Sequence, residues 1–467
     1  MPEQYQPIVA IAVFLITYAI IVSEKIHRTV IALAGAMVVV LLGILSLDSA
    51  VHAVDFNTIG LLVGMMIIVG VTRKTGVFEF LAIKAARASG GEPLKILAAL
   101  ALVTAVLSAL LDNVTTVLLI VPVTFAITNQ LKISPWPFLF TEILASNIGG
   151  TATLIGDPPN IMIGSATGLG FMDFVFNLTP VVVVVYVVTI FLLQLIYRDR
   201  LDTPEELKAN IMQMNEQDEI KDAVLLKKCL VILGLTILGF VLHQYVHLES
   251  SVIALAGASF LLLVTREDVE HALAAVEWPV LFFFIGLFVI IGALEEVGVI
   301  EMVAKWALET TGGNMLPTGM LILWLSAIAS AFVDNIPFVA TMIPLIQDMG
   351  RLGGITDLNL LWWSLSLGAC LGGNGTIIGA SANVVVVGMA EKRGVRITFI
   401  EFLKLAFPLM LMSIVISTGY LLLWYFLGHL PAAGITLGIG IVLAVLSKAL
   451  NGLLLKKPKK EVSPLEP

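Results

Sequence analysis

Two matching stretches inside long apolar segments constrain this chain most. The first is Gly149–Asn160, GGTATLIGDPPN, and the second is Gly372–Asn383, GGNGTIIGASAN. Glycines free the backbone in both stretches, and Pro158 and Pro159 remove N–H donors in the first, so each stretch predicts a helix that is interrupted part-way along. Interrupted backbone is tolerated at membrane depth only where protein or a water-filled cavity surrounds it. Paired interruptions of this kind indicate a binding site for a small solute.

The composition is that of a polytopic membrane protein. The chain has 467 residues, of which 58% are hydrophobic and 13% charged, and its mean hydropathy is +1.01. Its two cysteines, Cys229 and Cys370, lie in apolar segments and exclude a disulfide scaffold or a cysteine-based zinc site. The start, MPEQYQP, lacks the basic flank of a cleavable signal, so we expect the first apolar run to stay as a helix.

No phosphate-binding G-x-x-x-x-G-K-[ST] sequence is present, so we expect no direct use of ATP. No metal-ligand pair or nucleophile–base motif accompanies the acidic residues, which argues against intramembrane hydrolysis and any other enzyme activity. We expect no nucleic-acid partner, and no cofactor other than a bound Na⁺ or H⁺.

The apolar runs predict two halves of matching organisation. The first half, 7–197, has spans at 7–23, 29–47 and 57–72, a hairpin at 94–131, a broken helix at 136–166 and a span at 173–197. A polar loop at 198–228 contains a short surface helix. The second half, 229–427, has spans at 229–246, 251–265 and 277–294, a hairpin at 316–349, a broken helix at 359–390 and a span at 400–427. A further span at 433–454 and a tail at 455–467 complete the chain.

The basic residues predict the orientation. If both hairpins re-enter from the side they left, the chain crosses the membrane eleven times, and all of its 26 Lys and Arg except Lys305 and Arg351 fall on one side. That side is expected to be the cytoplasm, with the N-terminus outside and both the 198–228 loop and the tail inside a cell (inner) membrane. Hairpin arms that cross fully are the alternative, and they would leave the charge count unchanged.

The second half repeats the first. Val30–Ala36, VIALAGA, recurs intact at Val252–Ala258, and at the same offset Asp112–Asn113 matches Asp334–Asn335. Each half has an odd number of crossings, so the second copy must be inverted relative to the first. The stretches 79–89 and 301–311 are predicted to be helices lying at the interface, with ordinary loops as the alternative.

Asp112 and Asp334 are predicted to occupy the hairpin tips. A carboxylate at membrane depth is costly unless it is paired, protonated or bound to an ion, and the neighbouring apolar stretches contain no Lys or Arg. We therefore expect a base-free site in which a proton or Na⁺ binds at these residues and at Asn113 and Asn335. The alternative is that each Asp only caps the following helix, and the two roles are compatible.

Three further side chains of the broken helices are candidates with open alternatives. Asp157 has Ala380 as its repeat partner, so it is either an additional proton or substrate ligand or the cap of helix 158–166. Cys370 offers sulfur to arsenic(III), but a buried packing cysteine is the simpler interpretation. Glu142 belongs either to a proton path or to polar helix packing.

The resemblance to known proteins rests on four motifs: SALLDNVTTVLLIVPVT, SNIGGTATLIGDPPN, DNIPFVATMIPLI and GACLGGNGTIIGASANVVVVGMAE. They resemble the P protein family of pigment cells and its bacterial relatives, within an ion-transporter group that includes arsenite-efflux permeases, NhaD-type sodium–proton antiporters and dicarboxylate carriers. The resemblance implies a homodimeric elevator carrier, in which hairpins and broken helices form a transport unit that slides against scaffold helices. Dicarboxylate carriers have Ser-Asn-Thr at the hairpin tips where this chain has Asp-Asn.

Residues and resemblance together predict an all-α secondary active transporter, proton- or sodium-coupled, that exchanges cations or moves a small solute such as arsenite. A carboxylate carrier of the dicarboxylate type and a gated anion channel are the alternatives. Thr153, Thr376, Asn160 and Asn383 are expected to line one central cavity. The full set of candidate ligands is Asp112, Asn113, Thr115, Thr116, Asn147, Gly149, Gly150, Thr151, Thr153, Asp157, Asn160, Asp334, Asn335, Gly372, Gly373, Asn374, Thr376, Ser381 and Asn383.

Overall fold

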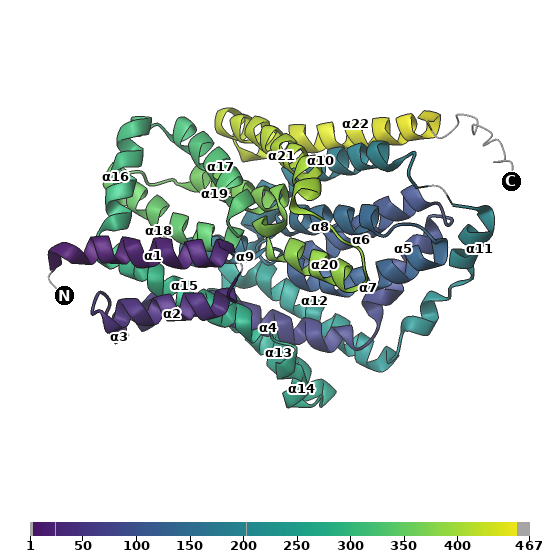
Figure 1. Ribbon diagram of the computed structural model, residues 1–467, viewed down its shortest axis with the longest axis horizontal. Coiled ribbons are helices and arrows are strands. Elements are labelled where there is room, and N and C mark those ends of the chain that lie inside the picture. The colour runs from purple at the N-terminus through teal and green to yellow at the C-terminus, as the bar shows by residue number, and fades with distance from the viewer. Residues whose placement is uncertain (1–2, 24, 202, 455–467) are drawn as a thin grey trace.

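The computed structural model describes residues 3–23, 25–201 and 203–454, and every regular element in these ranges is helical. The predicted tail at 455–467 lies outside the described residues. Figure 1 shows the helices running mostly along the long axis of the molecule, with the start of α1 and the end of α22 at opposite ends of that axis.

The first half comprises ten α-helices. They are α1 (Gln6–Ser23), α2 (Arg28–Leu41), α3 (Leu47–Ala53), α4 (Phe56–Arg73), α5 (Val77–Ala88), α6 (Pro93–Leu110), α7 (Asn113–Leu131), α8 (Trp136–Gly150), α9 (Pro158–Thr167) and α10 (Phe171–Tyr197). The helix α11 (Glu205–Gln213) and the 3₁₀ turn η2 (Glu216–Glu219) follow in the connecting loop.

The second half repeats this order. It comprises α12 (Ala223–Val246), α13 (Ser250–Thr265), α14 (Val269–Ala274), α15 (Trp278–Glu296), α16 (Val299–Thr311), α17 (Met315–Phe332), α18 (Asn335–Gly353), α19 (Asn359–Gly372), two 3₁₀ turns (η3, Gly373–Gly375; η4, Ile377–Gly379), α20 (Ser381–Lys392) and α21 (Phe399–Leu427). The final helix, α22 (His429–Leu454), packs along α10 and α21.

The predicted spans, hairpins and broken helices lie on these helices, and most bounds agree within a few residues. The span predicted at 29–47 ends earlier, at Leu41, and the span predicted at 229–246 begins earlier, at Ala223. In the described part of the chain, ten helices are long and apolar enough to cross a membrane, and α2 and α13 are shorter apolar helices. Counting each broken helix as one crossing and each hairpin as none gives the predicted eleven.

The repeated motifs explain how the two halves interlock. The VIALAGA segment of α2 packs against Gly286 of α15, and its copy in α13 packs against Gly64 of α4. A Cβ on Gly286 would lie 2.6 Å from the carbonyl carbon of Ala32, and a Cβ on Gly64 would lie 2.5 Å from that of Ala254. Since each half supplies both a glycine and a motif, the two contacts are related by the inverted symmetry of the repeat.

The hairpins and broken helices form a second group of helices. Hairpin α6–α7, with α5 and α11, lies at one end of the long axis, and hairpin α17–α18, with α16, lies at the other (Figure 1). Both α5 and α16 are helices, as predicted, and each buries an apolar face, for example at Phe78 and Ile300. The two hairpins therefore approach the middle of the protein from opposite ends, and their tips reach the broken helices there.

Candidate functional site

Each hairpin tip carries one of the repeated Asp-Asn pairs. Asp112 is the N-cap of α7 and accepts a hydrogen bond from the Thr115 N–H at 2.8 Å. Asp334 is the N-cap of α18 and accepts one from the Ile336 N–H at 3.1 Å. Both carboxylates therefore cap a helix, but each keeps an oxygen available for a second role.

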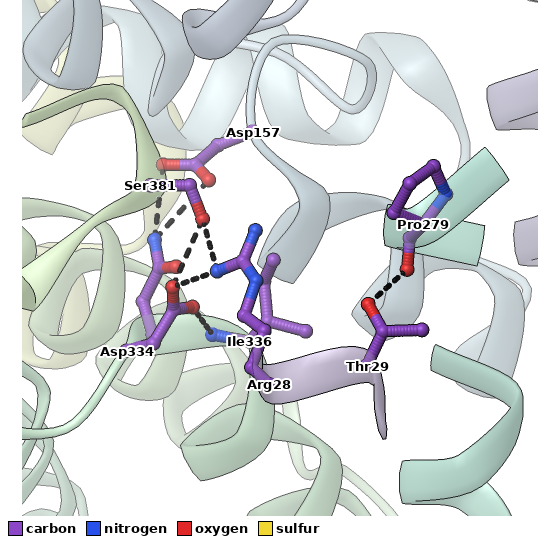
Figure 2. A network of polar contacts seen from close by, with 8 residues as sticks. Arg28, Thr29, Asp157, Pro279, Asp334, Ile336 and Ser381 are labelled. Carbon is purple, nitrogen blue, oxygen red and sulfur yellow. Dashed lines mark hydrogen bonds and ion pairs between the residues drawn. The ribbon is translucent and has the colours of Figure 1, made fainter. Parts of the chain in front are cut away.

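The expectation of a base-free site is wrong, because Arg28 pairs with Asp334. The Arg28 guanidinium lies 2.7 Å from the Asp334 carboxylate and donates a second hydrogen bond, also 2.7 Å long, to the Ser381 hydroxyl. The Ser381 hydroxyl in turn contacts Asp334 at 2.9 Å, so the three side chains form a closed triangle (Figure 2). The apolar stretches beside Asp334 in the sequence do not contain Arg28, because it lies 306 residues from Asp334 along the chain.

Arg28 reaches this position because it is the first residue of α2. The turn between α1 and α2 extends to the middle of the molecule (Figure 1). The guanidinium also lies over the ring of Phe283, 5.0 Å from its centre, and the neighbouring Thr29 anchors the turn by donating to the Pro279 carbonyl at 2.6 Å. Arg28 is thus fixed by the scaffold helices while it binds the hairpin and α20.

Two further carboxylates lie in the same electrostatic environment. Glu277 lines the same cavity as Arg28 and Asp334, and so does Val114, two residues beyond Asp112 at the tip of the first hairpin. Asp157 stands at the N-cap position of α9 but makes no capping hydrogen bond, so the capping alternative is wrong for this residue. Its carboxylate instead accepts a hydrogen bond from Asn335 of the opposite half at 3.2 Å. Four acids thus cluster with Arg28, an excess of negative charge that a proton or cation would relieve.

A cavity of about 380 Å³ opens beside the Arg28–Asp334 pair, a volume suited to a small solute. The polar part of its wall comes from His27, Arg28, Glu277, Asp334 and Ser381. The complete lining is Ile21, Val22, Ile26, His27, Arg28, Val114, Glu277, Phe332, Asp334, Ile378, Ser381, Val384 and Val385. Of the predicted ligands, Asp334 and Ser381 line this cavity.

The expectation that Thr153, Thr376, Asn160 and Asn383 line the cavity is wrong. Both asparagines are fully buried and hold the interrupted backbone together: Asn160 donates to the Thr151 and Thr153 carbonyls, and Asn383 donates to the Gly373 and Thr376 carbonyls. The two threonines donate to carbonyls of the adjacent hairpins, at Ala109 and Ala331. Carbonyls freed from a helix at membrane depth must be satisfied internally, and these side chains do so.

A chain of amides joins the two breaks and one hairpin tip. Asn113 donates to Asn147 at 3.0 Å, and Asn147 donates to both Asn374 and Asn383 at 2.9 Å. On the other side, the Asn160 side-chain oxygen accepts hydrogen bonds from Ser366 at 2.6 Å and from the Cys370 thiol at 3.6 Å. The two breaks therefore meet in the protein interior, and Cys370 is a buried packing residue.

The predicted glycine ligands serve close packing. A Cβ on Gly149 would lie 2.2 Å from the Ala105 carbonyl oxygen, and one on Gly372 would lie 2.6 Å from that of Ala327. Gly150 and Gly373 approach the backbone of the same break in each half, at Gly156 and Gly379. The Thr151 hydroxyl donates within α8, to the Asn147 carbonyl.

Buried oxygen atoms without a partner remain near the first hairpin tip. In the described part of the chain, the side-chain oxygens of Asn113 and Thr116 have no hydrogen-bond partner, although both residues are almost fully buried. One oxygen of Glu142 is in the same situation, while the other accepts a hydrogen bond from Thr124. An unsatisfied buried oxygen is costly, so it marks a place where a proton or cation can bind.

Comparison with known proteins now assigns the family. The profile of the citrate transporter family, CitMHS, matches residues 18–368. The chain belongs to this family. An uncharacterised transporter of Mycobacterium tuberculosis is 45% identical over 424 residues, covering 90% of this chain and 99% of that protein. A 46 kDa membrane protein of Mycobacterium leprae is 44% identical over 423 residues, with the same coverage.

The predicted resemblance to the P protein is also confirmed. The human P protein is 35% identical over 500 residues, covering 89% of this chain and 60% of the longer human protein. Among solved structures, the YdaH transporter of Alcanivorax borkumensis matches with a TM-score of 0.57 at 18% identity, covering 81% of this chain and 88% of that one. The CitMHS chain is therefore a membrane transporter with this fold and not an enzyme.

Proposed function

We propose that this CitMHS protein is a secondary active carrier in which a proton or Na⁺ binds at the first hairpin tip and the transported solute binds in the central cavity. The observation that carries this proposal is the difference between the two tips. At the second tip, Arg28 neutralises Asp334. At the first, Asp112 has no ion-pair partner among the described residues, and the buried oxygens of Asn113 and Thr116 are unsatisfied.

The chemistry of the first tip suits a small hard cation. Carboxylate, amide and hydroxyl oxygens are the ligands that such cations take in proteins. A proton on Asp112 would relieve the same excess charge, so proton and Na⁺ compete for one group. Competition between a proton and Na⁺ for one carboxylate is the simplest chemistry by which a carrier can couple transport to an ion gradient.

Arg28 changes which solute we favour as the transported substrate. Guanidinium groups bind carboxylates through paired, charge-assisted hydrogen bonds, and Arg28 lines the cavity. We therefore place a small carboxylate first, ahead of simple cation exchange and of a neutral solute such as arsenite. The family's description as citrate transporters supports this order.

The contacts between scaffold and transport unit support alternating access by an elevator motion. In the second half, Ser381 at the start of α20 contacts Arg28, whose repeat equivalent is Ser250. At the broken helix of the first half, the corresponding contact runs through Ser251, next to Ser250: the Ser251 N–H donates to Asn57, and Asn57 donates to Ser165. Ser165 lies seven residues beyond Pro158, the repeat equivalent of Ser381, a difference of about 10 Å along a helix. The broken helices of the two halves thus contact the scaffold at positions that differ along the helix. Such a difference is expected if this structure is one of two alternating states.

The cavity in this state is bordered by the α1–α2 turn, the end predicted to face the cytoplasm, so we assign an inward-facing state. In line with the homodimer that the family resemblance implies, we propose that two copies associate through scaffold helices while each transport unit moves separately.

Reconstitution into vesicles tests the function. The protein is assayed with an internal pH dye against Na⁺, Li⁺, arsenite, citrate and chloride, with and without ion gradients. We expect saturable carboxylate uptake driven by a proton or Na⁺ gradient, and counter-transport of labelled solute. Unsaturable chloride flux without coupling would identify a channel instead.

Asp112→Asn separates coupling from folding. Asparagine still caps a helix, so this variant should insert and melt like the wild type but lose gradient-driven uptake. Asp112→Ala should lose coupling and, because the cap is lost, about 1 kcal/mol of stability as well. Full coupled uptake by Asp112→Asn would leave Asp112 as a cap only and would contradict the proposed ion site.

A further inference from the structure

A second cavity, separate from the central site, opens between α6, α10 and α22. Its volume is about 740 Å³, roughly twice that of the central cavity. Its wall is mostly apolar, with Ala98, Leu102, Ile190, Phe191 and Ala444 among its lining. Leu102 is 53% exposed, so the groove opens sideways to the surroundings of the helices. In a membrane, such a groove faces lipid acyl chains.

One end of this groove is strongly basic. Lys95 of α6, Arg198 at the end of α10 and Lys448 of α22 line it, and the described residues of its lining include no acidic side chain. Arg198 has an ion-pair contact with Asp199, at the long distance of 3.9 Å. Within the described residues, Lys95 and Lys448 have no ion-pair partner. Three cations from three helices therefore converge at one mouth, and the sequence continues beyond α22 with Lys456, Lys457, Lys459 and Lys460.

The position of the mouth matches that of a lipid headgroup. Lys95 lies in the first turn of α6, Arg198 follows the last residue of α10, and Lys448 lies near the end of α22. All three helix ends lie toward the predicted cytoplasmic side, where Lys208 of α11 holds Glu92 just before α6. The basic mouth is thus at the level of the inner-leaflet headgroups and the apolar groove is at the level of their chains.

We propose that this groove binds an anionic phospholipid of the inner leaflet, with its phosphate at Lys95, Arg198 and Lys448 and an acyl chain along Leu102 and Ile190. Basic pockets between membrane helices select anionic headgroups, whereas an apolar groove alone would accept any phospholipid. The lipid would lie between α22 and the arm of the first hairpin, so it would contact the transport unit directly.

Native mass spectrometry tests this site. The purified full-length protein is exchanged into detergent containing equal amounts of phosphatidylglycerol and phosphatidylcholine, and retained lipids are counted. We expect phosphatidylglycerol to be retained preferentially by the wild type. Each lysine near a membrane surface contributes about a fivefold preference, so the variant Lys95→Gln/Lys448→Gln should lose about 25-fold.

The control is Lys221→Gln/Lys227→Gln, which removes two exposed lysines of the same predicted side, outside the groove. This variant should retain the lipid preference of the wild type. Equal retention of both lipids by the wild type would overturn the proposal, and so would an equal loss in the control. A Leu102→Cys variant that forms a disulfide between two copies would instead assign the groove to a protein interface.

Discussion

Arg28 begins α2, and its guanidinium bridges the scaffold and the tip of the second hairpin. Its side chain is 26% exposed and that of Asp334 is 11% exposed, so the pair is largely shielded from water. The net contribution of a shielded ion pair to stability is small. Removal of one partner is nevertheless costly, because the other charge is then left unpaired. The pair therefore joins the scaffold and the transport unit in one relative position. If the two units move, the Arg28 guanidinium and the Asp334 carboxylate each need a new partner.

Arg28→Met should destabilise the protein, because it leaves the Asp334 carboxylate without its cation. Since Arg28 is partly exposed, we expect a loss of about 1–3 kcal/mol, below the value for fully buried pairs. The double variant Arg28→Met/Asp334→Asn should recover at least half of this loss. Melting temperatures in detergent measure all three proteins, and a double variant no more stable than the single one would contradict this account.

The exposed pair of Lys305 and Glu301 on α16 provides the control for this experiment. Its atoms are 2.7 Å apart, as close as those of Arg28 and Asp334, but both side chains are well exposed. Water solvates either charge after the other is removed, so Lys305→Gln should leave the melting temperature unchanged.

At the scale of elements, each broken helix is maintained by one buried asparagine. Asn383 donates two hydrogen bonds of 2.8 Å to carbonyls that the break removes from regular helix pairing. Asn160 does the same in the first half. The interruption is therefore a closed structure, and the side chains that seal it are unavailable to a substrate.

Asn383→Ala should cost about 1–3 kcal/mol for each carbonyl left unsatisfied. Asn314→Ala is the matched control, because Asn314 is exposed and makes no capping hydrogen bond at the start of α17. Thermal unfolding followed by circular dichroism measures both variants. Equal melting temperatures would show that the break is held by the surrounding helices alone.

Two glycines of the broken helices, one closely packed and one not, test how far close helix contacts stabilise the protein. A Cβ at Gly149 would clash with the backbone of Ala105, whereas a Cβ at Gly388 would meet no atom within 4 Å. Gly149→Ala should therefore prevent or strongly reduce folding, and Gly388→Ala should keep or raise stability by up to about 1 kcal/mol. Expression and size-exclusion profiles check both. Normal folding of Gly149→Ala would mean that α6 and α8 can separate.

At the scale of the whole molecule, the two halves share one set of contacts within the scaffold but differ in how the scaffold meets the transport unit. Tyr18 of α1 donates to the Pro337 carbonyl of the second hairpin. Its repeat equivalent, Phe240 of α12, packs instead against Phe171 of α10. An inverted repeat makes the exchanged set of contacts available at similar energy, which is the physical basis for a second state.

Cross-linking distinguishes the two states. Asn57→Cys/Ser165→Cys joins groups now 3.0 Å apart and should lock the present state, leaving Val384→Cys in the cavity open to a cytoplasmic thiol reagent. Ser250→Cys/Pro158→Cys joins the repeat equivalents of Arg28 and Ser381, which now lie 2.7 Å apart, and should lock the opposite state and protect Val384→Cys. Identical labelling in both locked proteins would contradict an elevator exchange.

The orientation has its own test. Gln213→Cys in the connecting loop should react with an impermeant thiol reagent only after the cells are opened, and Lys305→Cys on α16 should react in intact cells. Both positions are exposed, and the native Cys229 and Cys370 are buried and should stay unlabelled. Labelling of Gln213→Cys in intact cells would invert the predicted topology.

The sequence by itself determined the features that depend on local chemistry. Glycines, joined in the first stretch by Pro158 and Pro159, marked where Gly149–Asn160 and Gly372–Asn383 leave the helix. Apolar runs marked the spans, and Asp112 and Asp334 were recognisable as helix caps. The repeat between the halves also determined the inverted architecture, because an odd number of crossings in each half permits no other arrangement.

Only the tertiary structure decided which polar groups meet. Arg28 pairs with a residue 306 positions away, and its repeat equivalent is the uncharged Ser250, so neither spacing nor symmetry indicates the pair. Asn160 and Asn383 carry side-chain amides of the kind that bind solutes, yet these amides donate hydrogen bonds to backbone carbonyls of their own breaks. The sequence lists the hydrogen-bond donors and acceptors of the chain. At membrane depth, the free energy of folding and of binding depends on which of these groups the packed helices leave unpaired.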